Sequence, residues 1–195
     1  MQNLIKKKNN QGFTLVEILM ASAIFIVMLE IIYGIYFSGL DIWEISHEQA
    51  YLQAQARIAL NYMVSELRNA TRTSTQNPPP NLSIPSTPNN KDIYFYLPED
   101  KDHDGLITDA NGQIEWDTNN KIHYQYIPGQ KILRRLEKGE QRDFAGDVSD
   151  VQFIDIDIDQ TLAIDELKII LTLSKTTPKK RNVSVTLTSI VALRN

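Results

Sequence analysis

The sequence predicts an α+β fold in which one long N-terminal α-helix packs on an antiparallel β-sheet domain. Two patterns lead to this prediction. An apolar run from Phe13 to Leu40 continues into a stripe of apolar residues at helical spacing, and the second half of the chain alternates apolar and polar residues. Alternation over short segments separated by turns is typical of antiparallel strands with one buried face.

The first half of the expected helix, residues 13–40, has the length and composition of a membrane span. No charge occurs between Ile18 and Leu29, and a span needs about 20 mostly apolar residues. Three lysines at positions 6–8 precede the run, and by the positive-inside rule they hold the N-terminus in the cytoplasm. We therefore expect a single-pass protein of the bacterial inner membrane that contacts lipid and exposes its C-terminal domain to the periplasm.

Glu17 is the residue that a simple anchor does not explain, because a carboxylate at the centre of a membrane helix costs about 2.5–3.5 kcal/mol. Three interpretations compete. A secretory signal peptide needs a small-residue cleavage site after the apolar run, and Ser38-Gly39-Leu40 fits poorly. A plain single-pass anchor leaves Glu17 without a purpose. The third interpretation is a leader that is cut before the apolar run, which the mature protein then retains.

The third interpretation rests on a specific motif. The lysine-rich leader, Gly12 and the run Phe13-Thr14-Leu15-Val16-Glu17 closely resemble the N-termini of type IV prepilins and type II secretion pseudopilins. The resemblance implies that residues 1–12 are a leader peptide, that a prepilin peptidase cuts between Gly12 and Phe13, and that it methylates the new Phe13 amine. It also implies that Glu17 pairs with the N-terminal amine of a neighbouring subunit, which would compensate the acid only in the assembly.

The same helix is expected to continue through residues 41–72 as an amphipathic half that packs on its own domain. Its apolar stripe is formed by Ile42, Ile45, Leu52, Ala56, Leu60, Met63 and Leu67. Residues 54–70 resemble the late-helix segment of PilW-like minor pilins and of minor pseudopilin J. This resemblance implies a minor-subunit role and does not separate a pilus from a secretion system.

Residues 73–195 are expected to form a β-rich globular head. A proline-rich loop at 76–90 opens it. Strands are predicted at 92–97, 121–127, 131–136, 148–158, 167–174 and 183–193, with turns at Pro128-Gly129 and Thr176–Arg181.

The segment 100–111 predicts a calcium loop, because it reads D-x-D-x-D-G-x-I. The expected ligand positions are Asp100, Asp102, Asp104, Leu106 through its carbonyl, Thr108, Asp109 and Asn111. Asn111 stands where a bidentate glutamate is usual, and Asp109, Glu115 or Asp117 are candidates to replace it. The alternative is an acidic turn without a metal, and His103 is expected to face solvent, since oxygen donors dominate calcium sites.

Composition narrows the function. The chain has no cysteine and a net charge of −4, so thiolate metal sites are excluded and nucleic acid is a poor fit as a partner. No catalytic residues are identified, and we expect a structural protein and not an enzyme.

The main hypothesis is a minor pilin or pseudopilin in the tip or priming complex of a type IV pilus or type II secretion pseudopilus. Its partners would be the prepilin peptidase, other minor subunits, the major subunit and the inner-membrane assembly platform. The alternatives are a filament-tip binding module, such as an adhesin or secretion-substrate receptor that uses the proline-rich or acidic loop, and an anchored envelope enzyme.

Overall fold

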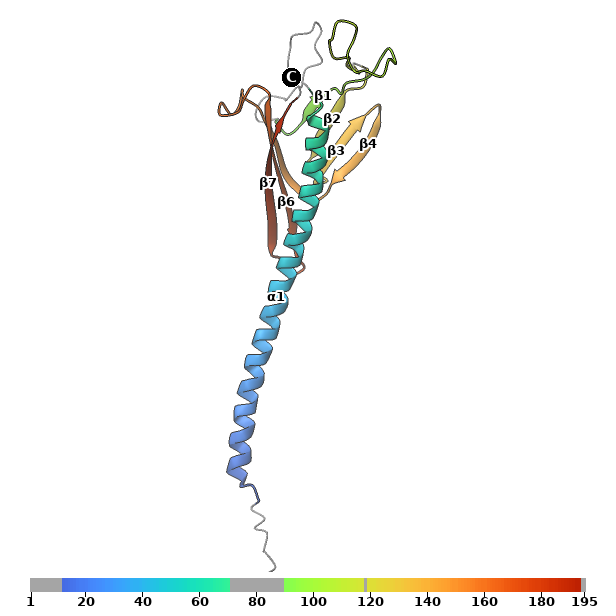
Figure 1. Ribbon diagram of the computed structural model, residues 1–195. Helices are drawn as coiled ribbons and strands as arrows, with labels where there is room; N and C mark the ends of the chain where they lie inside the picture. Colours follow the sequence, from blue (N-terminus) through green and yellow to red (C-terminus); the bar gives the residue numbers. More distant parts are fainter. Residues whose placement is uncertain (1–11, 71–89, 118, 194–195) are drawn as a thin grey trace, which may run out of the picture. The chain divides into compact units, whose positions relative to one another are not determined.

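The computed structural model describes residues 12–70, 90–117 and 119–193, and it has the α+β architecture expected from the sequence (Figure 1). One helix, α1, spans Leu15–Leu67. The strands in the described part of the chain are β1 (Ile93–Phe95), β2 (Ile122–Ile127), β3 (Ile132–Glu137), β4 (Glu140–Ala145), β5 (Val148–Ile154), β6 (Glu166–Thr176) and β7 (Asn182–Ala192). They form two antiparallel sheets, ordered β1-β2-β3-β4 and β5-β6-β7.

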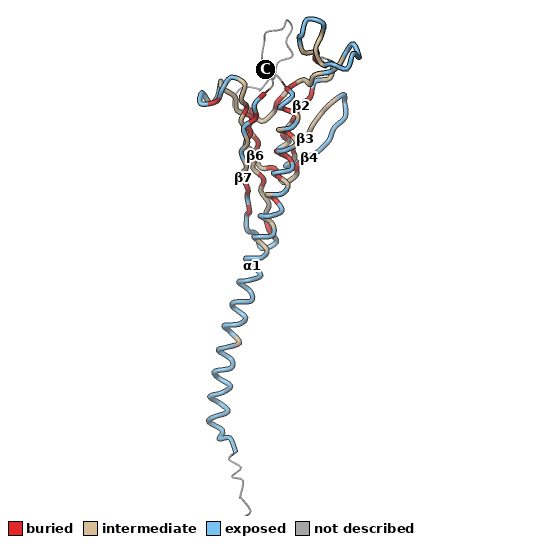
Figure 2. The backbone as a smooth tube through the Cα atoms, viewed as in Figure 1, coloured by how far each residue is buried: buried red, intermediate tan, exposed pale blue. Residues whose placement is uncertain are grey.

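The chain divides into two compact units, Met1–Glu44 and Ile45–Asn195. In the described part of the first unit, the residues along the apolar run are exposed (Figure 2), with Leu29 alone at intermediate exposure. This segment holds a helical window of mean hydropathy 2.5 of which no residue is buried. By length and composition α1 can therefore cross a membrane, and its apolar side chains are not used for packing within the first unit.

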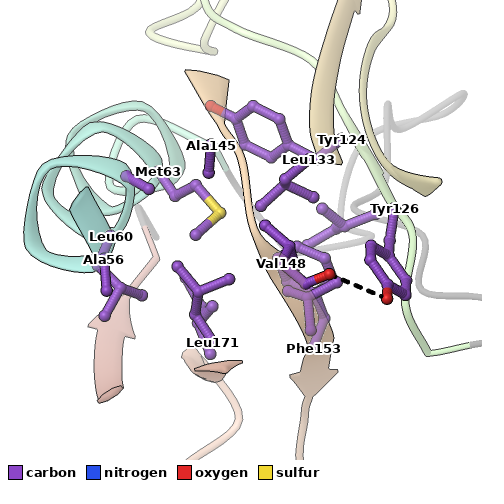
Figure 3. Close-up of a cluster of buried hydrophobic side chains, with 14 of the residues drawn as sticks. Ala56, Leu60, Met63, Tyr124, Tyr126, Leu133, Ala145, Val148, Phe153 and Leu171 are labelled. Atoms are coloured by element: carbon purple, nitrogen blue, oxygen red, sulfur yellow. Dashed lines mark hydrogen bonds between the residues drawn. The ribbon is translucent and has the colours of Figure 1, made fainter. Parts of the chain in front are cut away.

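In the second unit, α1 packs through one stripe of its surface onto both sheets. The buried residues of the helix are Leu52, Ala56, Ala59, Leu60, Met63 and Leu67. Figure 3 shows part of the core, where Ala56, Leu60 and Met63 face Leu171 and Val148. The stripe predicted from Leu52 onward is confirmed, whereas Ile42 is 66% exposed. Fully burying one Leu or Met side chain stabilises a fold by about 1.5–3 kcal/mol, so this stripe is a main source of the head's stability.

A largely buried ion pair connects α1 to the four-stranded sheet. Arg135 on β3 donates to Glu66 on the helix from Nε (3.0 Å) and approaches its other oxygen from Nη2 (3.0 Å), and the side chains are only 12% and 16% exposed. The hydroxyl of Tyr124 on β2 also donates to Glu66, and Arg135 Nη1 donates to Glu137 at 2.7 Å. Burial raises the pKa of Tyr124, and the Glu66 carboxylate raises it further. The phenol therefore stays protonated and remains the donor.

Strand β4 was not predicted from the sequence. Its residues begin with four polar side chains, Glu140-Gln141-Arg142-Asp143, which hide the alternation that marks a half-buried strand. The sequence signal for this strand was the turn before it, Lys138-Gly139. In the structure both residues have positive φ, 51° and 84°. A two-residue loop of this kind joins antiparallel strands whose twist it matches, here β3 and β4 with Glu137 paired to Glu140.

Strand β5 ends at Ile154, four residues before the predicted end at Ile158. Asp155 stops the strand, because its side chain accepts the N–H of Asp157 (3.1 Å) and its carbonyl accepts the N–H groups of Ile158 and Asp159. Aspartate favours such local turns. Asp157 and Asp159 therefore lie in a turn and not on the polar face of a strand.

The ion pair leads to a prediction that uses two adjacent arginines of β3. Arg135→Ala leaves the Glu66 carboxylate buried without its cation, and breaking a buried pair in this way destabilises a fold by about 3–5 kcal/mol. Arg134 also contacts an acid, Asp143, at 2.6 Å, but that pair lies at the surface, where ion pairs contribute little. Arg134→Ala should therefore change the melting temperature far less. Thermal unfolding of the full chain in detergent compares the two variants, and equal losses would contradict this account.

Candidate functional site: the helix start and the acidic loop

The start of α1 is built by a reciprocal cap between Thr14 and Glu17. The Thr14 N–H and hydroxyl both donate to Glu17 Oε2, at 2.9 and 3.0 Å, and the Glu17 N–H donates back to Thr14 Oγ1 at 3.3 Å. This is the capping box, in which a Thr at the cap and a Glu three residues later satisfy backbone N–H groups that have no partner in the helix. This role of Glu17 was not predicted from the sequence, although the spacing Thr-x-x-Glu is its signal.

The capping box gives Glu17 a role within its own chain. In the sequence alone, a plain anchor leaves the acid without a purpose. The structure provides one purpose within the chain, because the carboxylate closes the first turn of α1. A partner's cation is thus no longer the only physical reason for an acid here, and the two roles make different demands: the cap needs a hydrogen-bond acceptor, whereas pairing with an amine needs a negative charge.

The predicted cleavage site lies just before this cap. Gly12 and Phe13 precede the first helical residue, Leu15, and Phe13 is 85% exposed. A Cβ added to Gly12 would meet no heavy atom within 4 Å. The chain's own packing therefore does not require glycine at position 12. A requirement that arises outside this chain, such as close approach to a peptidase backbone, is consistent with that freedom.

The acidic loop is held by antiparallel bridges between the segment before it and the segment after it. Isolated bridges pair Pro98 with Trp116 and Thr108 with Ile114. The Glu115 N–H donates to the Ile107 carbonyl at 2.9 Å, and Glu99 N–H donates to the Glu115 carbonyl at 3.0 Å. These contacts fold residues 98–116 back on themselves and bring Glu115 to the start of the loop.

The loop gathers three carboxylates. One oxygen from each of Asp100, Asp102 and Glu115 lies within 4.8 Å of the others. The N–H of Asp104 lowers the pKa of Asp102, but desolvation and the charges of Asp104, Glu115 and Asp100 outweigh it, so that the pKa is raised overall. Mutual repulsion of this kind is relieved by a cation, and carboxylate oxygens are what Ca²⁺ prefers.

The other predicted ligands are placed differently. Asp104 caps the turn by accepting the N–H of Leu106 at 2.7 Å, and the Leu106 side chain is 58% exposed. Asp109 accepts the N–H groups of Asn111 (2.9 Å) and Gln113 (2.8 Å), and these bonds lower its pKa. Of the three residues considered as replacements for the usual glutamate, Glu115 lies beside Asp100 and Asp102. Asp109 is used in its own turn, and Asp117 accepts a hydrogen bond from Asn120.

His103 is exposed, as expected, and one of its ring nitrogens lies 3.1 Å from the Lys101 carbonyl. The proline-rich loop at 76–90 lies outside the described residues except for Asn90, which is buried and whose carbonyl accepts the Phe153 N–H at 2.8 Å.

Comparison with known proteins agrees with the helix start. Residues 7–29 match the family model of the prokaryotic N-terminal methylation motif. The chain thus carries the leader motif of type IV pilins and pseudopilins, and the motif supports a pilin-like precursor with an apolar N-terminal helix fit for membrane anchoring. Processing by a prepilin peptidase and assembly with other pilins are what this motif implies. No match was found among curated proteins or among solved structures.

Proposed function

We propose that this chain is a minor pilin or pseudopilin subunit that is cut between Gly12 and Phe13, methylated on the Phe13 amine, and assembled into the tip or priming complex of a type IV pilus or type II secretion pseudopilus. The observation that carries the proposal is the methylation motif at residues 7–29, which includes the start of α1, a helix whose apolar side chains are unpacked in the first unit. In this function the head acts by presenting surfaces and not by catalysis.

The role of α1 in the assembly follows from its side chains. Exposed apolar residues along its first half can remain only in lipid or against other helices of the same kind. Before assembly, residues 13–40 would span the inner membrane, with the N-terminus in the cytoplasm and the head in the periplasm. During assembly they would exchange lipid for neighbouring subunits, and the Glu17 carboxylate would exchange part of its cap for the methylated amine of a neighbour.

Substituting Glu17 separates the two roles of its carboxylate. Glutamine serves in a capping box as well as glutamate does, so Glu17→Gln retains the helix start and removes only the charge, whereas Glu17→Ala removes both. If the charge pairs with a neighbour's amine, both variants should be depleted at least about tenfold from filaments sheared from cells that also express the host's other pilin-like subunits. Incorporation of Glu17→Gln at the wild-type level would show that capping is the only role of the acid.

We further propose that the loop at 98–116 binds Ca²⁺ through Asp100, Asp102 and Glu115, with Glu115 in place of the glutamate that Asn111 lacks. Support comes from the three carboxylate oxygens that lie within 4.8 Å of one another and from the raised pKa of Asp102, to which desolvation and then the charges of Asp104, Glu115 and Asp100 contribute against the Asp104 N–H. With few ligands on an exposed loop, the affinity should lie at about 10⁻⁴–10⁻³ M, the range of extracellular calcium modules.

Calcium should then raise the melting temperature of the full chain in detergent, because a ligand that binds only the folded state stabilises it. The melting temperature is compared between excess chelator and a Ca²⁺ concentration of 10 times the dissociation constant, where binding stabilises the fold by roughly 1.4 kcal/mol. Glu115→Gln should abolish this rise in melting temperature. Asp109→Asn, a neutralisation in the same loop outside the carboxylate trio, should retain it. No shift in the wild-type chain at millimolar Ca²⁺ would leave the loop as an acidic turn.

A further inference from the structure

The edge strands of the two sheets differ in how they are protected. Unpaired strand edges attract other strands, and proteins usually block them with charges, bulges, proline or short length. In the described residues the edge strands are β1, β4, β5 and β7. Strand β1 has three residues, β4 carries Glu140, Arg142 and Asp143 beside a register shift, and β5 carries Asp150 at another shift.

Strand β7 has none of these protections. Its eleven residues, NVSVTLTSIVA, contain no charge, proline or glycine. It pairs with β6 over the full length of both strands, from Glu166–Ala192 to Thr176–Asn182, without a shift. Valine, threonine and isoleucine also favour extended backbone. It is the long, regular and uncharged edge in the described part of the head.

The hydrogen bonds at the two ends of this ladder show which backbone groups face outward. Thr177 N–H donates to the Arg181 carbonyl at 2.8 Å, and Leu193 N–H donates to the Asp165 carbonyl at 2.7 Å. Both pairs continue the register of β6 and β7. Because hydrogen-bonded pairs recur at every second residue, the odd-numbered residues of β7 bond to β6. The N–H and C=O groups of the even-numbered residues point away from β6.

The outward groups form a continuous row along the middle of β7, at Ser184, Thr186, Thr188 and Ile190. In the described residues, no backbone hydrogen bond outside the ladders engages these four. Their side chains are exposed on the solvent face of the sheet, whereas Val183, Val185 and Val191 point into the core. A strand added here would continue the sheet, with its own apolar side chains on the core face beside Leu187. Because β7 carries no charged side chain, the added strand needs no charged side chain of its own to pair with it.

A second copy of this chain does not fit this edge with its core on the same face of the sheet. Two copies that both use the β7 edge are related by a two-fold axis, and when both cores lie on one face of the continued sheet the axis is perpendicular to the sheet and the strands are antiparallel. Within the second unit, Ile45–Leu67 of α1 runs alongside β6 and β7 (Figure 1). The two-fold axis would therefore reverse one helix relative to the other. The chain that precedes Ile45 would leave the two copies at opposite ends, although both anchors must enter one membrane with the same polarity.

We propose that the free edge of β7 accepts a β-strand from a different pilin-like subunit, which adds to the β5-β6-β7 sheet beside Ser184–Ile190. The strand would be uncharged along the contact and apolar at alternate positions. Its main-chain hydrogen bonds would provide affinity and its side-chain alternation the register. The identity of the occupant rests on the proposed function, since the proposed assembly brings other pilin-like subunits beside this chain.

Proline at position 188 tests the proposal, because it removes an outward N–H and no hydrogen bond to β6. Proline is tolerated on an edge strand at such a position, so Thr188→Pro should keep the melting temperature of the control, Thr188→Val, which retains the N–H. A photo-crosslinking residue at Thr186 in the full-length chain, expressed in its host, reports the neighbour. We expect a crosslink to another protein with a methylation-motif leader, unchanged by Thr188→Val and reduced at least about tenfold by Thr188→Pro.

Thr188→Lys is the second variant, should Thr188→Pro prevent folding. It keeps every backbone group and adds an edge charge of the kind that blocks strand addition, so it should reduce the crosslink as well. A crosslink to a second copy of this chain, to a protein without such a leader, or to no protein overturns the inference, as does a crosslink that survives both variants. Leader cleavage is scored in the same cells: cleavage without the crosslink removes only this inference, and absence of cleavage removes the proposed function.

Discussion

A single continuous helix in this chain has to satisfy two solvents, and the rest of the structure depends on that constraint. Residues 15–67 form α1 without a break, yet the apolar side chains of its first half are exposed, whereas its second half buries one stripe of them from Leu52 to Leu67. The head covers that stripe with two sheets, whose buried residues form one core with Leu52, Met63 and Leu67. The first half has no such cover within its own unit, and lipid or other helices must supply it.

Two acids of the helix, one near each end, have identified partners. Near the start, Glu17 closes the first turn with Thr14 and carries the charge that the proposed assembly uses. Near the end, Glu66 is held by Arg135 and Tyr124 and ties the helix to the four-stranded sheet. Each of the two acids has partners of its own, so its contacts can be removed by substitution without affecting those of the other acid. For Glu66 the partners are within the head, whereas for Glu17 the cap is local and the proposed cation comes from a neighbour.

Much of this could be predicted from the sequence, for physical reasons that differ between elements. The helix was predictable because its apolar spacing is sustained and no proline interrupts it before Pro78. The hairpin of β6 and β7 was predictable because strict alternation flanks a polar turn. The leader motif was predictable because Gly12 and the run from Phe13 to Glu17 form a short and specific pattern, and the methylation-motif match at residues 7–29 confirms it.

Other features could not be predicted, because they depend on contacts between distant parts of the chain. The division into two sheets depends on β5 pairing with β6 and not with β4, and local patterns do not record that choice. Glu115 lies 15 residues after Asp100 in the sequence, and only the bridges around Thr108 and Pro98 bring the two together. The pairing of Glu66 with Arg135 likewise joins residues 69 positions apart. The capping box is different, since it joins residues only three positions apart and its Thr-x-x-Glu spacing is visible in the sequence.

The most direct test of the central claim is the chemistry of the mature N-terminus. Mass spectrometry of the full chain, expressed with a prepilin peptidase, should find a protein that begins at Phe13 and carries one methyl group on its α-amine. The same chain with Gly12→Ala, where an added Cβ would meet no heavy atom within 4 Å, should keep residues 1–12. A wild-type chain that retains its first twelve residues in the presence of active peptidase would contradict the account.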